Sequence, residues 1–260
     1  MKYIIIPCLN ESRCIGKVIR VCEESDAEGI IVVENGSDDG SLELVKNNLS
    51  EKTQIIFVNI PLGHDIPKAL GLHYALLEGG EYFIFFDGDM TGMTREDINT
   101  IFKALEGGVD LALTDCYCDG NLPEGLASYV LEFRKMLNNE LNIFSKIKYA
   151  SPSHGPVGLS KKLAEAVPDE YLGIPPLLLQ YAAENDYDID IGLSKLHSEL
   201  GSSERTEKHR LKMAETIVGD TLYALRSTNN NIANRKYDGI DYTGFHENRR
   251  FDILDMITKK

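Results

Sequence analysis

Short apolar runs rich in β-branched residues alternate along this sequence with segments whose apolar residues recur at helical spacing. This alternation is typical of βαβ units and argues against an all-β fold. We therefore predict an α/β protein with a Rossmann-like, mixed and mainly parallel sheet, helices on its faces and a C-terminal helical extension. The pattern places strands at 3–8, 29–34, 54–59, 82–87, 109–114 and 187–191, a short strand after a loop at 151–161, and helices at 12–24, 41–48, 67–78, 94–106, 124–144, 175–185 and 204–226.

Two of these helices carry further predictions. Ser12 is a candidate N-cap of the first helix, because a serine hydroxyl satisfies a free amide of the first helical turn. The helix at 124–144 carries an apolar stripe that we expect to pack into the core. The stripe consists of Leu126, Tyr129, Val130, Phe133, Leu137, Leu141 and Phe144.

Chain length indicates the domain organisation. At 260 residues, the chain is long for one α/β domain and short for two, so one domain with an extension is expected. We predict a domain at 1–226 with two halves, 1–115 for the donor and 116–226 for the acceptor of a reaction. The segment 227–260 is polar with few periodic apolar residues, which favours a flexible lid or an arm on a neighbouring subunit of a homodimer.

The formal net charge of −14 limits the partners. Nucleic acids are bound by clustered Lys and Arg, so we expect no nucleic-acid partner. A phosphorylated small molecule can still bind where a metal ion or a few cations offset the carboxylates. The apolar run at 3–7 ends too early for a signal peptide or membrane span, and no later run is long enough, so we expect no transmembrane segment and a cytoplasmic location.

Cysteine usage agrees with a reducing compartment. The five cysteines are odd in number and form no CxxC pair. Cys116 and Cys118 stand two apart, so on a strand both would point to one face, and a metal role stays open. Two ordinary thiols are the favoured interpretation, because the spacings typical of zinc sites are absent.

Polar clusters follow three of the predicted strands. In a doubly wound sheet, ligands bind beyond the carboxyl ends of the strands, where the strand order reverses. We therefore expect these clusters to meet in one crevice. They are Asn10 and Glu11 after the first strand, Glu34 to Asp39, including Asn35, after the second, and Asp87, Gly88 and Asp89 after the fourth.

The residues of that crevice limit its ligand. The first turn, PCLNES, lacks the glycines of a GxGxxG dinucleotide site, which excludes NAD. The acidic turn ENGSDDG would repel pyrophosphate and is better suited to accept hydrogen bonds from base or ribose hydroxyls. Asp87 and Asp89 in FFDGDM suit a ribose hydroxyl and Mg²⁺ or Mn²⁺, hard cations that bridge phosphates. Alone, this DXD pattern would be a solvated turn.

Taken in order, the motifs resemble a known family. IIIPCLNES, VVENGSDDGS, a lysine at a helix start and EYFIFFDGDM resemble the N-terminal half of family 2 and related nucleotide-sugar glycosyltransferases of the GT-A fold, over about residues 1–115. The resemblance implies a nucleotide-diphosphate sugar donor and a metal at Asp89, with Asp87 on the ribose and beside the metal. It implies a donor pocket lined by Pro7, Asn10, Glu11, Glu34, Asn35 and Gly88. Members usually carry Asp at the position of Glu34, so the base stays open.

Lys68 has two interpretations. It matches a lysine that often reaches the donor phosphates in this family, which makes it, with Asp89, a candidate catalytic residue. A solvated lysine at a helix start is the equal alternative.

The C-terminal half resembles a narrower group. HGPVGLSKK, PPLLLQYAAENDYDIDIGLSKLH and the following long helix are similar to the retaining glucosyl- and mannosyl-3-phosphoglycerate synthases and mannosylglycerate synthases. In that group a histidine after the last strand completes the metal site, and His197 falls at that place. Neutral imidazole is a suitable ligand beside a carboxylate. A surface histidine is the alternative, and Pro175 and Pro176 stand where the group tends to have an acidic residue.

The loop at 151–160 bears on mechanism and acceptor. Inverting members of family 2 commonly take a general base from an acidic pair after this loop, whereas the loop here contains no carboxylate, which favours a retaining mechanism. Ser153, His154 and the amides around Gly155 are candidates for binding an anionic acceptor such as glycerate or phosphoglycerate. Simple solvent exposure explains the same polarity.

A basic cluster stands out in the acidic chain. Arg205, Lys208, His209 and Arg210 either bind a phosphate or pair with Glu204 and Glu207 by helix spacing, and pairing is the favoured interpretation.

Together these observations predict a metal-dependent glycosyltransferase that moves a sugar from a UDP- or GDP-sugar to a small hydroxylated acceptor. Three alternatives stay open: an inverting family 2 transferase, a sugar-phosphate nucleotidyltransferase, and a non-catalytic nucleotide-sugar binding protein. The nucleotidyltransferase is disfavoured because PCLNES lacks a Gly-rich basic loop.

Overall fold

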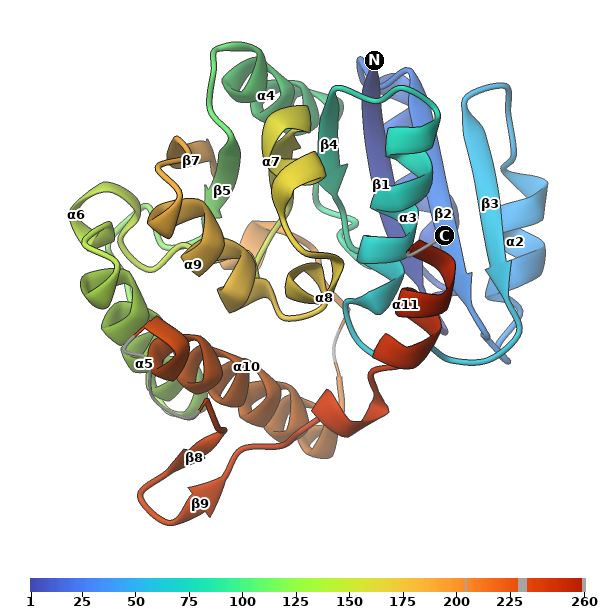
Figure 1. Cartoon of the computed structure of the whole chain (residues 1–260). Helices are drawn as coiled ribbons and strands as arrows, with labels where there is room; N and C mark the ends of the chain where they lie inside the picture. Colours follow the sequence, from blue (N-terminus) through green and yellow to red (C-terminus); the bar gives the residue numbers. More distant parts are fainter. Residues whose placement is uncertain (204, 229–232, 259–260) are drawn as a thin grey trace.

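A seven-stranded sheet forms the centre of the protein (Figure 1). The structure is a computed structural model that describes residues 1–203, 205–228 and 233–258. The strand order is β3-β2-β1-β4-β6-β5-β7. The strands are β1 (Lys2–Cys8), β2 (Gly29–Asn35), β3 (Thr53–Val58), β4 (Tyr82–Phe85), β5 (Leu111–Asp115), β6 (Val157–Ser160) and β7 (Ile189–Ser194).

The sheet is mixed and mainly parallel, as predicted. Only β6 runs antiparallel, between β4 and β5, and the remaining neighbours pair in parallel. The order of the strands reverses between β1 and β4, which are adjacent although β2 and β3 separate them in sequence. This is the place in a doubly wound sheet where ligands bind.

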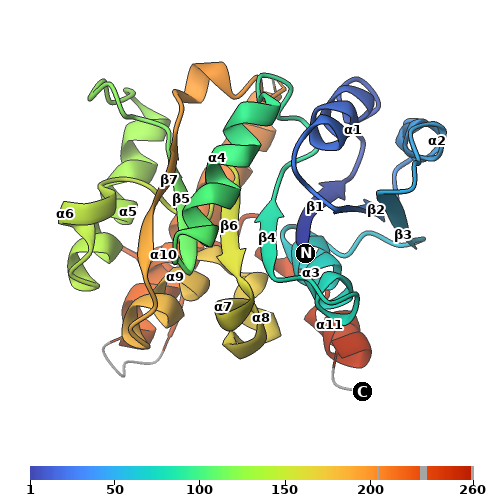
Figure 2. The ribbon, with the colours of Figure 1, turned by 90° about the horizontal axis from the view of Figure 1, so that it is seen from above.

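Helices cover both faces of the sheet. In Figure 2, α1, α2 and α4 lie on one side, and α3, α7, α8 and α11 lie on the other. The helices are α1 (Ile15–Glu24), α2 (Ser41–Asn47), α3 (Ile66–Leu77), α4 (Arg95–Glu106), α5 (Leu126–Glu140), α6 (Phe144–Ile147), α7 (Lys161–Ala166), α8 (Asp169–Leu172), α9 (Pro175–Glu184), α10 (Glu207–Thr228) and α11 (Phe251–Thr258). Short 3₁₀ turns occupy His197–Glu199 and His246–Asn248.

The core consists of two layers, one on each face of the sheet. Ile5 and Ile31 point to the layer under α3, whereas Ile4 and Ile6 point to the layer under α1 and α4. Because both faces are covered, the central strands are apolar almost throughout, which explains the continuous β-branched runs in the sequence. A third, smaller cluster joins Val130 and Phe133 of α5 to α10.

Several predicted elements differ in their ends. The predicted helix 124–144 is two helices, because Asn142 adopts a left-handed conformation with φ 59° between α5 and α6. Its apolar stripe is only partly buried, since Leu126 and Tyr129 are exposed. Ser12 does not cap α1: the N-cap is Cys14, without a side-chain hydrogen bond, and the Ser12 amide donates to Asp39 instead. The predicted start of the last long helix, residue 204, lies outside the described residues.

The C-terminal segment contains more structure than its polarity indicated. A small hairpin, β8 (Lys236–Tyr237) and β9 (Ile240–Asp241), precedes α11. The helix α11 packs against α3 and α8 (Figure 1). For 227–260 the sequence predicted a lid or an oligomer arm; the described part docks on its own chain. Among the described residues, no helix combines the length and apolarity required to cross a membrane.

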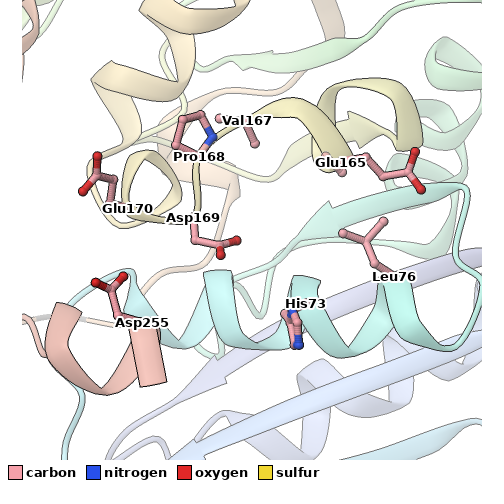
Figure 3. A pocket seen from close by; sticks show the side chains of 9 residues that line it. His73, Leu76, Glu165, Val167, Pro168, Asp169, Glu170 and Asp255 are labelled. Carbon is pink, nitrogen blue, oxygen red and sulfur yellow. The ribbon is translucent and has the colours of Figure 1, made fainter. Parts of the chain in front are cut away.

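A groove of about 480 Å³ lies between the second half of α3, α7, α8 and α11 (Figure 3). Glu165, Asp169, Glu170 and Asp255 line it together with His73. His73 lies in the second half of α3, whereas Lys68 lies in the first turn of this helix. The groove is therefore separate from the predicted crevice.

Candidate active site

The polar ends of β1 and β4 meet, as the topology requires. A Cβ atom placed on Gly88 would lie 3.0 Å from the carbonyl oxygen of Pro7 and 3.4 Å from Glu11 Cγ. Burial raises the pKa of Glu11, and the nearby charges of Asp89 and Asp87 raise it further, against the lowering effect of Arg205. Glu11, Asp87 and Asp89 therefore share one acidic crevice at the point where the strand order reverses.

Hydrogen bonds join the loop after β1 to the loop after β2. The Asn10 amide donates to Ser37 Oγ at 3.0 Å, and the Asp38 amide donates to Asn10 Oδ1 at 2.9 Å. Asn10 adopts a left-handed conformation with φ 58°, which asparagine tolerates better than most residues. Asn10 thus sets the wall of the crevice on the β2 side.

Glu34 and Asn35 lie beneath this wall, and both are buried. The Glu34 carboxylate accepts the amides of Ser37 at 2.7 Å and Gly36 at 3.2 Å. Asn35 Oδ1 accepts the Leu62 amide at 2.6 Å, which ties the loop before α3 to the end of β2. Both side chains therefore fix the backbone of the loops at this end of β2.

Lys68 is not a solvated lysine. Its side chain is 11% exposed, and Nζ lies 2.9 Å from Asp87 Oδ1 and 3.3 Å from Asp65 Oδ1. Burial would lower the pKa of Lys68, but the two carboxylates outweigh burial and raise it, so the ammonium stays charged. The first turn of α3 therefore presents a positive charge to the DXD loop.

Arg205 reaches the same loop from the other side. Its Nη2 donates to Glu11 and, at 3.1 Å, to Asp89 Oδ2, which also accepts the Ser203 amide at 3.2 Å. Arg205 contacts these two carboxylates and not Glu207, because it precedes α10 and its guanidinium crosses to the loops after β1 and β4, whereas Glu204 lies outside the described residues. No short-range spacing signalled this contact.

The predicted metal ligands fall into two groups. Asp89 binds Arg205, whereas His197 Nδ1 lies 2.9 Å from His154 Nε2. Within the described residues, no three His, Cys, Asp or Glu side chains are grouped to hold a metal ion. Cys116 is buried and Cys118 exposed, and both are free thiols.

The histidine pair rests on a buried arginine that the sequence analysis missed. Arg134 of α5 is 4% exposed, and its Nη1 lies 3.2 Å from His154 Nδ1. Burial lowers the pKa of His154 well below its usual value, and Arg134 and His197 lower it further, so His154 is neutral at pH 7. No carboxylate in the described part of the chain forms an ion pair with Arg134. One signal in the sequence could have identified Arg134: no Asp or Glu stands three or four residues away on the same helix to pair with it.

The loop before β6 places two more polar groups there. Ser153 Oγ is buried and has no hydrogen-bond partner among the described residues. Gly155 has φ 77°, and a Cβ there would lie 2.8 Å from Thr114 Cβ, so only glycine fits. Gly155 thus lies where the loop passes β5, and His154 lies next to Arg134 and His197.

Sequence comparison places these motifs in a family. A sequence model described as glycosyl transferase family 2 matches residues 3–154. An uncharacterized protein from Methanocaldococcus jannaschii is 26% identical over 121 residues, which cover 46% of this chain and 48% of that protein. The match thus spans about half the length of this curated relative.

Solved structures share the fold. Glucosyl-3-phosphoglycerate synthase from Mycobacterium tuberculosis, in complex with Mn²⁺, UDP and phosphoglyceric acid, is 17% identical with a TM-score of 0.63 over 86% of this chain and 78% of that chain. Mannosyl-3-phosphoglycerate synthase from Rubrobacter xylanophilus is 12% identical with a TM-score of 0.65 over 94% and 79%. At these identities the likeness shows the fold alone, and it confirms the predicted GT-A architecture.

Proposed function

Because the chain belongs to glycosyl transferase family 2, we propose that it transfers a sugar from a UDP- or GDP-sugar to a small hydroxylated acceptor. One observation carries this proposal. Glu11, Asp87 and Asp89 converge at the strand-order reversal, with the charged Lys68 directed at Asp87. The carboxylates can bind ribose hydroxyls and a divalent cation, and the adjacent ammonium can bind phosphates. A nucleotide-diphosphate sugar requires these groups.

The donor would lie across the ends of β1, β2 and β4. Pro7, Asn10 and Glu11 would face the nucleoside, on a wall that Glu34 and Asn35 hold in place. Asp87 would accept a ribose hydroxyl, with Gly88 allowing close approach. Lys68 would move its ammonium from Asp87 to the phosphates, where it stabilises negative charge on the leaving diphosphate.

A divalent cation, Mg²⁺ or Mn²⁺, fits the same crevice. Asp89 and Glu11 already share a positive group, the Arg205 guanidinium, which stands in for a cation beside hard oxygen ligands. Asp89 would hold the ion, with Asp87 close by and His197 as a further ligand after release from His154. When bound, the ion supplies charge stabilisation for the departing diphosphate.

The acceptor would bind next to β5 and β6. Arg134 is a buried cation without a carboxylate partner in the described residues, and Ser153 Oγ, one residue before His154, is an unused donor. A buried positive charge favours an anion. Glycerate or phosphoglycerate supplies such an anion together with a hydroxyl, and the mycobacterial neighbour is in complex with phosphoglyceric acid. Ser153, His154 and the Gly155 amide would orient the carboxylate or phosphate.

We propose a retaining mechanism, which the absence of a carboxylate at 151–160 favours. An inverting reaction requires a general base beside the acceptor hydroxyl. The neutral His154 is hydrogen bonded on both ring nitrogens, to Arg134 and His197, which leaves it poorly suited to that role. The leaving diphosphate itself would then accept the acceptor proton.

A transfer assay tests this proposal. UDP-glucose, GDP-mannose and related donors are incubated with Mn²⁺ and either glycerate or 3-phosphoglycerate, and products are separated by mass spectrometry. We expect a glycosylated acceptor that retains the anomeric configuration of the donor. Donor that stays intact with every acceptor, and also without acceptor, would favour a non-catalytic nucleotide-sugar binding protein.

A further inference from the structure

A chain of alternating charges runs from the candidate donor site to the C-terminal segment. We propose that Arg249 is a positioning residue: by neutralising Asp65, it keeps the Lys68 ammonium directed outward, toward Asp87 and the donor phosphates. This inference rests on the role proposed above for Lys68. It adds a function for the C-terminal segment, whose described residues contribute no group to the crevice itself.

Arg249 lies at the centre of the charge chain. Lys68 Nζ contacts Asp87 at 2.9 Å and Asp65 at 3.3 Å. Arg249 Nη2 donates to Asp65 Oδ2 at 3.1 Å and to Asp220 Oδ2 at 2.8 Å, and its Nη1 donates to Asp220 Oδ1 at 2.7 Å. Arg235 completes the series with a 2.7 Å contact to the same Asp220. Three carboxylates thus alternate with three cations.

Burial differs along this chain in a way that points to function. The side chains of Arg249, Asp65 and Asp220 are 0%, 4% and 3% exposed, whereas Asp87 is 38% exposed. A buried charge that loses its partner is strongly destabilising, so each inner member depends on its neighbours. The outer end, at Asp87, is the place where the network meets solvent and ligand.

Asp65 holds an unusual conformation at the start of α3. It is the N-cap residue with φ 64°, in the left-handed region that aspartate rarely adopts, and its side chain makes no capping hydrogen bond. The carboxylate is directed at Lys68, His64 and Arg249 instead. The cations around Asp65 therefore hold both this conformation and the first turn that carries Lys68.

The backbone around Arg249 is fitted to the same loop. Arg249 Nε donates to the His64 carbonyl at 3.1 Å, and the Arg250 amide donates to the Leu62 carbonyl at 2.9 Å. A Cβ on Gly63 would lie 2.3 Å from the Asn248 carbonyl oxygen, so the two segments approach as closely as a glycine permits. Residues 248–250 thus press the loop 62–65 against the end of β2, where Asn35 holds Leu62.

Loss of the Arg249 charge has a definite consequence for Lys68. Asp65 would keep Lys68 as its remaining lysine or arginine partner. In a buried environment the uncompensated carboxylate would draw the Lys68 ammonium inward. Lys68 would then be withdrawn from Asp87 and from the phosphates, although Arg249 itself touches neither.

The test measures UDP and Mn²⁺ binding by calorimetry, and steady-state kinetics, for Arg249→Met. We expect a dissociation constant for UDP weaker by about tenfold, the loss of one charge-assisted contact, together with a rise of the donor KM and a fall in kcat, since Lys68 acts on the leaving diphosphate. The control is Arg250→Met, whose exposed side chain pairs with Asp252 and whose amide contact is unchanged. Equal UDP affinity in Arg249→Met and Arg250→Met would overturn the proposal.

A rescue variant separates positioning from a purely structural role. Arg249→Met combined with Asp65→Asn removes the carboxylate that draws Lys68 inward, while Asp220 keeps Arg235. We expect the double variant to regain most of the UDP affinity, and further loss would overturn the proposal. If Arg249→Met does not fold, UDP affinity is compared between Arg250→Met, Arg249→Lys and the double variant Arg249→Met with Asp65→Asn.

Hydrogen exchange separates this inference from the proposed function. Without any ligand, Arg249→Met should exchange faster than Arg250→Met in peptides covering 62–70, and equal exchange would contradict the contact network. If the wild type binds neither UDP nor GDP, the proposed function and the role of Lys68 both fail, whereas the exchange result still reports on the contacts of Arg249.

Discussion

The guanidinium of Arg205 lies 3.1 Å from the carboxylate of Asp89, measured from Nη2 to Oδ2, and the same nitrogen also donates to Glu11. Arg205, which precedes α10, therefore holds Glu11 in the loop after β1 and Asp89 in the loop after β4. Because a divalent cation at Asp89 would need this oxygen, the arginine and the cation compete for it. The Ser203 amide also donates to this oxygen, so the cation would displace that hydrogen bond as well.

Arg205→Met should therefore lower the Mn²⁺ concentration required for UDP binding. The pair is partly exposed, at 33% for Arg205, and such a pair contributes at most about 1 kcal/mol, so we expect a shift of up to roughly fivefold. Calorimetric titration of Mn²⁺ at constant UDP measures it. Arg210→Met, on an exposed position of α10, is the control. A higher Mn²⁺ requirement would mean that Arg205 binds the donor and does not compete with the ion.

Glu34→Ala should destabilise the protein. Glu34 is fully buried, and its loss leaves the amides of Gly36 and Ser37 without acceptors, at a cost of about 1 to 3 kcal/mol. Urea unfolding gives the free energy of unfolding, with the exposed Asp38→Ala as the matched control. A value within about 0.5 kcal/mol of wild type would show that the loop does not depend on this carboxylate.

Arg134→Met should impair acceptor binding and leave the donor untouched. A buried guanidinium that binds an anion contributes about 1.5 to 3 kcal/mol, which corresponds to a rise of tenfold or more in the KM for an anionic acceptor. The donor KM should stay within twofold or so, because Arg134 contacts His154 and not the DXD loop. Lys135→Met is the control. Equal losses for donor and acceptor would indicate a general structural role.

Acid stability should depend on Asp65. Burial alone would raise the pKa of Asp65, but His64, Lys68 and Arg249 outweigh it and lower the pKa to about 2. A lowered carboxylate pKa stabilises the fold above the unfolded-state pKa near 3.9, and that stabilisation is lost as the pH falls toward 2. At pH 7 the free energy of unfolding of Asp65→Asn should thus be lower than that of the wild type, by on the order of 2 kcal/mol. The difference between the two should shrink as the pH falls toward 2. A deficit independent of pH would contradict this assignment.

The sequence predicted the sheet and the place of the site for a physical reason. Hydrophobic period reports burial, so the runs around Ile5, Ile31 and Ile84 located β1, β2 and β4. Strand ends in a parallel sheet share one edge, which was enough to bring Glu11 and Asp89 together. These inferences need only local pattern and topology.

Local pattern and topology could not predict the ion-pair partners of Arg205 and Arg249. Arg205 had acidic neighbours in its own segment, and Arg249 stood in a polar tail, whereas their contacts with Asp89 and Asp65 span more than one hundred residues of the chain. Which carboxylate a buried arginine meets depends on the packing of whole elements. The helix α11 was not predicted for a related reason. Its eight residues are too few to give a clear hydrophobic period, and it gains stability by packing on α3 and α8.

The binding of UDP or GDP to Asp89→Ala, with Mn²⁺ and with EDTA, tests the central claim most directly. For the wild type we expect Mn²⁺ to tighten nucleotide binding strongly, since the ion offsets the acidic crevice. In Asp89→Ala, calorimetry should find the same weak binding with Mn²⁺ as with EDTA, and transfer should be abolished. Mn²⁺-dependent binding of wild-type strength in Asp89→Ala would contradict the assignment of this site.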